Sequence, residues 1–387
     1  MDVVVASSEP TSLLFSQATL PGRRLRVSII LPVRNEASHL TDTVTALANQ
    51  TDGDGNSLES DLYEVLLLTN NCTDDSAAIA RHCQQLFPAL NLHVEDVILP
   101  PGKNTIGALR RMLMDEACKR LSTAGGNNGI IASTDGDTIV DTQWVYQIIK
   151  EIDNGSDAVG GRILTPPFNH AVRRYYLRDV MYRTLLAQAE AVSDPPGHDT
   201  WPKHFQYFGA NFAVTCKAYL QAGRLPPVAY LEDVAFYQAL LLIDAKVRRS
   251  SDVKVYTSAR LRGKVEVGFS EQLQKWNDMA RRNVVQTVEP TATSLLRYEN
   301  RSLFRRCRNS FLQNKAGTEQ LQEAAAKFSL CPHWLTNTLQ TRPYFGQVWQ
   351  AVERKTKEMN PVDRTEQIPI TQAIYELRVF LHGCRKG

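Results

Sequence analysis

The sequence predicts an α/β fold with a mainly parallel sheet and helices on both faces. Apolar runs of strand length occur at 27–32 ("VSIILP") and 62–71 ("LYEVLLLTNN"), and a segment with helical apolar spacing, 36–50, lies between them. Strands that alternate with helices are typical of βαβ units. The length of 387 residues fits two or three domains, or one elaborated α/β domain with a helical addition.

The alternation continues beyond the second strand. We expect helices at 72–87, 104–121 and 142–152, and strands at 91–99, 129–132 and 157–164. The pattern then changes. A long helix is expected over 170–192, a flexible or substrate-facing Pro-rich segment over 193–205, and two edge strands within 247–261. From 270 onward the pattern is almost entirely helical.

Composition excludes several classes of protein. The net charge is only +3 and there is no long basic block, so we expect no nucleic-acid partner. None of the seven cysteines forms a C-x-x-C pair, which argues against a zinc cluster or a disulfide framework. The apolar runs are shorter than the ~20 residues of a transmembrane helix. The amino terminus carries Asp2 and places its Arg residues after the apolar part, unlike a secretory signal, so a cytoplasmic location is expected.

Two acidic pairs stand where ligands usually bind. In "STDGDT" (133–138), Asp135 and Asp137 directly follow a predicted strand, at the sheet edge that binds ligands in open α/β folds. Carboxylate oxygens suit Mg²⁺, although a turn rich in Asp and Gly is also an ordinary loop. Glu232 and Asp233 open an apolar helix, where acidic residues serve either chemistry or helix stability.

These segments, taken in order, resemble the family 2 glycosyltransferases, nucleotide-sugar-dependent enzymes of the GT-A fold. The resemblance covers about 27–290 and rests on "VSIILPVRNEASHL", "YEVLLLTNNCTDDS", "IGALRRMLMDEA", "STDGDT", "VGGRI", "FGANFAVTCKAYLQAG" and "YLEDVAFYQAL". It implies transfer of a sugar from a nucleotide sugar to a hydroxyl-bearing acceptor, with inversion. It implies a GT-A domain at 27–290 and does not explain the rest of the chain, which we divide into a lead-in (1–26) and, from its helical pattern, a helical extension (291–387). Within the domain, 27–141 forms the nucleotide-binding half and 142–290 the acceptor half.

The resemblance also assigns roles to residues. Asp137, with Asp135 second, is implied to hold Mg²⁺ or Mn²⁺, and Asp233, with Glu232 second, to be the general base. The implied donor-binding residues are Pro32, Val33, Arg34, Glu36, Thr69, Asn70, Asp135, Gly136 and Asp137. Arg110, Arg260 and Arg262 are further donor-binding candidates on chemical grounds, because a guanidinium fork can bind diphosphate oxygens, although a single Arg is more often a solvated surface charge. The residues implied on the acceptor side are Gly209, Asn211 and Trp276.

The chain departs from the family pattern at the nucleobase. Thr69 stands where the family carries the Asp that reads uracil, and Asn70 follows it. Both side chains accept and donate hydrogen bonds, so a UDP-sugar and a GDP-sugar both remain candidate donors. Val33 and Arg34 replace the usual aromatic residue, which weakens the case for base stacking there.

Two alternative functions stay open. A sugar-nucleotide nucleotidyltransferase shares the sheet type but needs a Gly-rich basic loop after the first strand, and "PVRNEASH" has no Gly. A non-catalytic nucleotide-sugar-binding protein would keep the fold without the chemistry. The sequence leaves formation of a homo-oligomer open.

Overall fold

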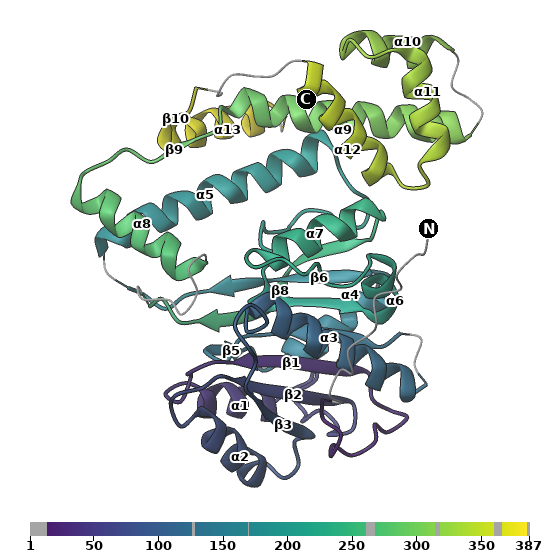
Figure 1. Cartoon of the computed structure of the whole chain (residues 1–387). Helices are drawn as coiled ribbons and strands as arrows, with labels where there is room; N and C mark the ends of the chain where they lie inside the picture. Colours follow the sequence, from purple (N-terminus) through teal and green to yellow (C-terminus); the bar gives the residue numbers. More distant parts are fainter. Residues whose placement is uncertain are drawn as a thin grey trace.

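A computed structural model describes residues 14–125, 128–168, 170–260, 268–313, 318–359 and 366–384. Its main feature is an eight-stranded sheet of order β3-β2-β1-β4-β7-β6-β8-β5 (Figure 1). The strands are β1 (Val27–Val33), β2 (Tyr63–Asn70), β3 (Leu92–Val97), β4 (Ile130–Ser133), β5 (Thr138–Val140), β6 (Ala158–Leu164), β7 (Phe212–Thr215) and β8 (Val247–Thr257). Only β7 and β5 run against the other strands, so the predicted mainly parallel sheet is confirmed.

Helices cover both faces of this sheet. One face packs against α1 (Leu40–Ala48), α2 (Ser76–Leu86) and α4 (Trp144–Asp153). The other packs against α3 (Ile106–Thr123), α6 (Cys216–Gln221) and α7 (Glu232–Leu242). Every residue of β1 and β2 is buried, which is why these strands are continuous apolar runs and show no alternation.

The prediction of two edge strands within 247–261 is wrong. This stretch forms the single strand β8, which lies inside the sheet between β6 and β5. Polar residues lie in the middle of this stretch, and the sheet accommodates them at an irregularity. Gly161 of β6 faces Ser250, whereas the next residue, Arg162, faces Lys254. The short strand β5, which pairs with β8, was not predicted.

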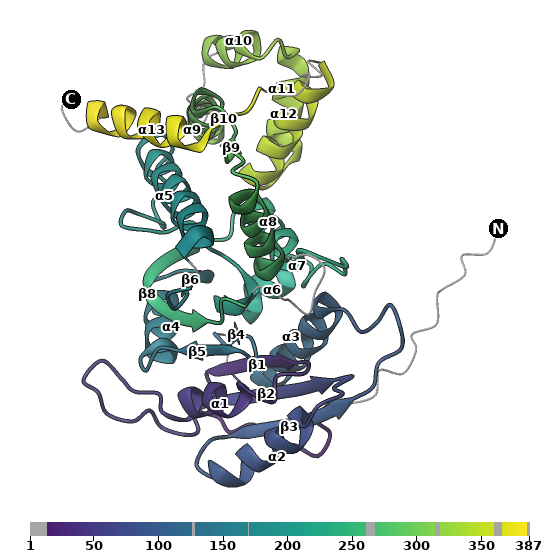
Figure 2. The same ribbon diagram turned by 90° about the vertical axis from the view of Figure 1, so that its left-hand side faces the viewer.

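The helical part beyond 270 is confirmed, together with the long helix α5 (His170–Ser193). The helices that follow are α8 (Phe269–Arg281), α9 (Thr291–Leu312), α10 (Thr318–Lys327), α11 (Pro332–Thr341), α12 (Phe345–Met359) and α13 (Ile370–Cys384), with two short strands, β9 (Thr287–Val288) and β10 (Ile368–Pro369). Figure 2 shows α5 between the sheet and the carboxyl-terminal helices. Among the described residues, no helix has the length and apolar character needed to cross a membrane.

The Pro-rich segment 193–205 is held in place, contrary to the flexibility that its composition suggested. Asp199 is 2% exposed and accepts hydrogen bonds from the backbone and the guanidinium of Arg249 on β8. Lys203 is equally buried and pairs with Glu190 of α5 at 3.2 Å. Buried charges with partners on two other elements fix a segment that has no regular structure of its own.

Candidate functional site

The turn between β4 and β5 carries Asp135 and Asp137. The backbone amide of Thr138 donates to the carbonyl of Asp135 at 3.1 Å, which closes the turn. The turn follows the carboxyl end of β4, beside the carboxyl ends of β1 and β2, as predicted. Gly136 permits close approach of the end of β1 and the loop that follows it, because a Cβ at residue 136 would lie 3.2 Å from side-chain atoms of Val33 and Glu36.

Pairing of β5 with β8 brings distant residues to Asp137. Thr138 faces Thr257, and their hydroxyls are 3.1 Å apart. The chain leaving β8 therefore passes the turn, where the Ser258 hydroxyl donates to Oδ2 of Asp137 at 2.7 Å. Ser258 was missed from the sequence, since a lone Ser carries no signal until the strand pairing is known.

Arg260 connects the acidic turn to the first loop. Its guanidinium donates two hydrogen bonds to Glu36, at 2.7 and 2.9 Å, and lies 3.0 Å from Oδ2 of Asp137. The pKa of Arg260 is raised, first by its hydrogen bond to Glu36 and then by the charge of Asp137. Glu36 itself is 6% exposed, so this ion pair is largely shielded from water.

Arg110 forms a second cationic centre, beneath the turn. One guanidinium nitrogen bonds to Asp135 and the other to Glu232 at the start of α7. Burial alone would lower the pKa of Arg110, but the two carboxylates outweigh it and raise the pKa. Loss of hydration within the surrounding protein raises the pKa of the Asp135 carboxyl, and the charge of Arg110 offsets part of that rise.

Two glycines make room for Arg110 and its partners. A Cβ on Gly209 would lie 2.3 Å from the Arg110 guanidinium. On Gly107, in the first turn of α3, it would lie 2.7 Å from the carbonyl of Val228 and 3.2 Å from Cβ of Glu232. The starts of α3 and α7 can thus meet only because residue 107 has no side chain.

Asp233 faces the same centre from the first turn of α7. The backbone amide of Gly209 donates to its Oδ2 at 3.0 Å, and its Oδ1 accepts from the amide of Val234 at 2.7 Å. Leu231 precedes the helix with φ +56°, a left-handed conformation that costs a non-glycine residue about 1 kcal/mol. Strained backbone of this kind is common at functional sites.

Buried polar atoms that lack a partner among the described residues lie at this edge of the sheet. Oδ1 of Asn70, Nε of Arg110 and the hydroxyl of Thr134 are buried without a hydrogen-bond partner among the described residues. Buried polar groups in proteins rarely stay unsatisfied, so a bound polar ligand is a natural partner for them. Thr69 differs, because its hydroxyl is bonded to Asp96 of β3 at 2.6 Å, a residue that sequence reasoning did not single out.

Other predicted residues are less informative or lie elsewhere. Pro32 is buried, and Arg34 is exposed to solvent. The amide of Asn211 is fully used by Trp144 and by the carbonyls of Arg162 and Val253, so this acceptor-side candidate acts in folding. Arg262 lies outside the described residues.

Trp276, the remaining acceptor-side candidate, is 4% exposed. It packs against Tyr176 in the cluster between α5 and α8, where it has almost no surface to offer an acceptor.

The donor set at the turn fits a divalent cation that is shared with a substrate. Among the residues that the structure describes, no three His, Cys, Asp or Glu side chains are grouped to hold a metal. Asp137 and Asp135 offer carboxylate oxygens from one turn, and Mg²⁺ is usually held by one or two carboxylates plus substrate phosphates.

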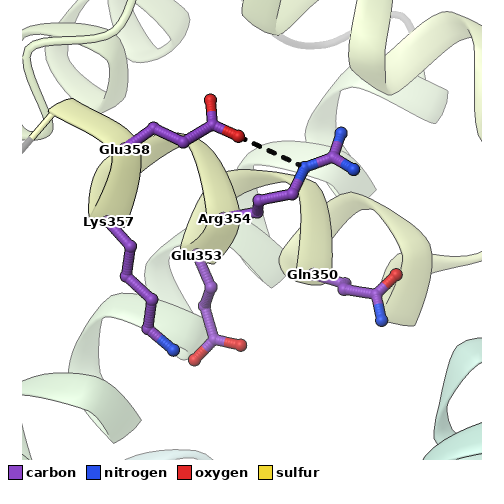
Figure 3. A pocket seen from close by; sticks show the side chains of 5 residues that line it. All are labelled: Gln350, Glu353, Arg354, Lys357 and Glu358. Atoms are coloured by element: carbon purple, nitrogen blue, oxygen red, sulfur yellow. Dashed lines mark ion pairs between the residues drawn. The ribbon is translucent and has the colours of Figure 1, made fainter.

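Two hollows elsewhere on the surface contain none of the candidate residues. One, of about 420 Å³, is lined only by residues of α12, where Arg354 and Glu358 pair at 3.8 Å (Figure 3). The other, of about 640 Å³, lies beside β3 and the segment from Phe15 to Thr19.

Comparison with known proteins relates part of this chain to a family. Residues 28–208 match the model of glycosyl transferase family 2. This match, which covers just under half of the chain, confirms the resemblance to the family 2 glycosyltransferases over these residues. Glycosyltransferase AglE of Haloferax volcanii is 27% identical over 138 residues, which are 35% of this chain and only 39% of AglE.

Solved structures of glycosyltransferases are also similar to this chain. TarS 1–349 of S. aureus in complex with UDP-GlcNAc has a TM-score of 0.44 and 15% identity, and the match covers 87% of this chain and 92% of that one. The mannosyltransferase PcManGT from Pyrobaculum calidifontis, in complex with GDP-Man and Mn²⁺, has a TM-score of 0.43 and 15% identity. That match covers 88% of this chain and 83% of PcManGT.

Proposed function

We propose that this protein transfers a sugar from a nucleoside-diphosphate sugar to a hydroxyl acceptor, with inversion and with the help of a divalent metal. The observation that carries the proposal is the meeting of two acidic pairs. Asp135, from the turn after β4, and Glu232, from the start of α7, bind the same Arg110 guanidinium. A donor-side turn and an acceptor-side helix thus converge on one point.

On the donor side, Asp137 is the proposed metal ligand, with Asp135 beside it. The bound metal supplies Lewis-acid stabilisation of the charge that builds up on the leaving diphosphate. Arg260, at the same turn, is a further candidate to bind diphosphate oxygens, because a guanidinium fork matches them in a bidentate way. The amide of Asn70 is the proposed nucleobase contact, and its mixed donor and acceptor character suits uracil and guanine alike.

On the acceptor side, Asp233 is the proposed general base. The hydrogen bond from the Gly209 amide orients its carboxylate and leaves oxygen lone pairs to accept the proton of an acceptor hydroxyl. Glu232 is less suited to that task, because its carboxylate is buried and already neutralised by Arg110.

The first experiment is a donor screen with a matched variant. The purified chain is incubated with UDP-, GDP-, dTDP- and ADP-sugars in Mg²⁺, Mn²⁺ or EDTA, and free nucleoside diphosphate is measured. We expect metal-dependent release from one donor, reduced by about 10²-fold or more in Asp137→Asn. Asp141→Asn is the control, since Asp141 only caps the turn into α4.

Three results would contradict parts of this proposal. Full activity of Asp137→Asn would remove its metal role, and release that persists in EDTA would remove the metal requirement. Binding of nucleotide sugars without turnover across many acceptors would favour a non-catalytic binding protein.

A further inference from the structure

Arg260 lies against one of the two carboxylate oxygens of Asp137, the proposed metal ligand. Its guanidinium lies 3.0 Å from Oδ2 of Asp137, the same oxygen that accepts the Ser258 hydroxyl at 2.7 Å. A guanidinium and a divalent cation repel each other strongly at such separations in a shielded site. Arg260 and a metal ion therefore compete for Asp137.

The two arginines of the site differ in their freedom to move. The side chain of Arg110 is 8% exposed and is enclosed by Gly209 and two carboxylates. That of Arg260 is 29% exposed and stands on the chain that follows the last residue of β8. Arg110 is thus a fixed part of the structure, whereas Arg260 can exchange its partners.

A diphosphate provides the alternative partner. Its oxygens accept a guanidinium fork with the same bidentate geometry that Glu36 uses, and they carry more negative charge than one carboxylate. If Arg260 turns from Asp137 to the diphosphate, the Asp137 oxygen becomes available to the metal. Asp137, together with the diphosphate oxygens, would then be able to hold the metal, since carboxylate and phosphate oxygens are the ligands that Mg²⁺ prefers.

We propose that Arg260 couples metal binding to donor binding by holding Asp137 until a diphosphate takes the guanidinium away. This inference rests on the proposed function, since it assumes that the site takes a nucleoside diphosphate and a metal. It makes Arg260 a positioning residue that sets the order of binding, in addition to a contact with the donor. Metal binds weakly to the free protein and tightly once the diphosphate is present.

The test is Mn²⁺ binding to the full chain without nucleotide, measured from the electron paramagnetic resonance signal of free Mn²⁺. We expect Arg260→Met to bind Mn²⁺ about tenfold more tightly than the unmodified protein, within the usual range of couplings between two sites. Arg260→Lys, which keeps a charge for Glu36 but has no fork to span two carboxylates, should lie between them. It also serves as the informative variant if Arg260→Met does not fold.

Arg24→Met is the matched control. Arg24 also pairs with two carboxylates, Glu59 and Asp61. It precedes β1, however, and so lies at the amino ends of the parallel strands, away from the acidic turn at their carboxyl ends. Its loss should leave Mn²⁺ binding unchanged.

A second titration separates this inference from the proposed function. UDP and GDP are titrated with and without Mn²⁺, after correction for the metal that each nucleotide binds in solution. We expect Mn²⁺ to strengthen nucleotide binding less in Arg260→Met than in the unmodified protein. Equal Mn²⁺ affinity of the two proteins, including no binding by either, overturns the inference even if donor turnover is observed. A clear difference in Mn²⁺ affinity without turnover of any donor supports the inference and counts against transfer.

Discussion

At the scale of single residues, Glu232 and Asp233 are neighbours in sequence but have different surroundings. The Glu232 side chain is 4% exposed and forms an ion pair with Arg110, so its negative charge is balanced within the protein. Asp233 is half-buried, and a backbone amide holds it in place. An oriented carboxylate that is not held in a buried ion pair keeps oxygen lone pairs available for the proton of an acceptor hydroxyl.

Asp233→Asn should therefore remove the base and preserve the fold. We expect transfer to fall by about 10³-fold, within the usual contribution of general acid–base catalysis, while nucleotide binding stays the same. The carboxamide oxygen can still accept from the Gly209 amide and only the contact with the adjacent Val234 amide is lost, so the melting temperature should fall only slightly. Initial rates, nucleotide titration and calorimetry measure the three quantities.

Glu232→Gln is the matched comparison for Asp233→Asn. It leaves the buried Arg110 with one fewer charged partner, so we expect a lower melting temperature and a smaller loss of rate. The assignment is wrong if Glu232→Gln abolishes transfer and Asp233→Asn does not.

At the scale of elements, local signals were predictable and long-range pairings were not. The turn after β4 could be predicted because an apolar run and two Asp residues lie side by side in the sequence. β5 has three residues, Thr138–Val140, too few to show a period, and without it nothing connects Ser258 to Asp137. Arg260 was expected to bind the donor. Its pairing with Glu36 spans 224 positions and cannot be inferred from the sequence of either segment.

The Pro-rich segment shows the same limit and allows a prediction about pH. Its composition suggested a flexible or substrate-facing loop, yet His204 is buried, and both of its ring nitrogens have partners. Nδ1 accepts from the amide of Gln206, and Nε2 donates to the carbonyl of Ser250, each at 2.9 Å. This arrangement needs the neutral imidazole, and burial lowers the pKa of His204 from 6.5 to about 4.

The stability that His204 contributes should be lost on acidification. In the unfolded chain the ring takes up a proton near pH 6.5, whereas in the folded protein it does so only near pH 4. The unfolded state thus binds more protons between these values, and the free energy of unfolding falls as pH falls through this window, in total by on the order of 3 kcal/mol. The contribution is complete above about pH 6.5.

Urea unfolding at pH 7, 6 and 5 measures this effect. His204→Gln should be less stable at pH 7 and should show a flatter dependence between pH 6.5 and 5. Glu190 and Asp199 also have a lowered pKa, but the ordinary pKa values of their carboxyls are 4.5 and 3.8, so their effect begins at lower pH. An identical slope in the variant would mean that His204 does not titrate as described.

At the scale of the whole molecule, α5 joins the sheet-containing part to the carboxyl-terminal helices. Val172 and Tyr175 pack with α8, and Tyr182 and Ala189 pack with α13. At its end, Asp194 is 1% exposed and bonds to Arg301 and Arg305 of α9. These contacts bear on the proposed boundary between a transferase domain, 27–290, and a helical extension, 291–387. They indicate that the two parts support each other.

We therefore predict that the described parts of the chain unfold in one transition and that Asp194 contributes to it. Asp194→Asn keeps the shape of the side chain but removes the charge that lies between two arginines. Removing one partner from a buried ion pair typically costs 3–5 kcal/mol, and because Arg301 and Arg305 keep some exposure we expect about 2 kcal/mol. Lys275→Met, which breaks only an exposed pair with Glu271 on α8, should change stability by less than about 0.5 kcal/mol. Calorimetry that resolves two transitions, only one of them lowered by Asp194→Asn, would show instead that the helical extension folds independently of the transferase domain.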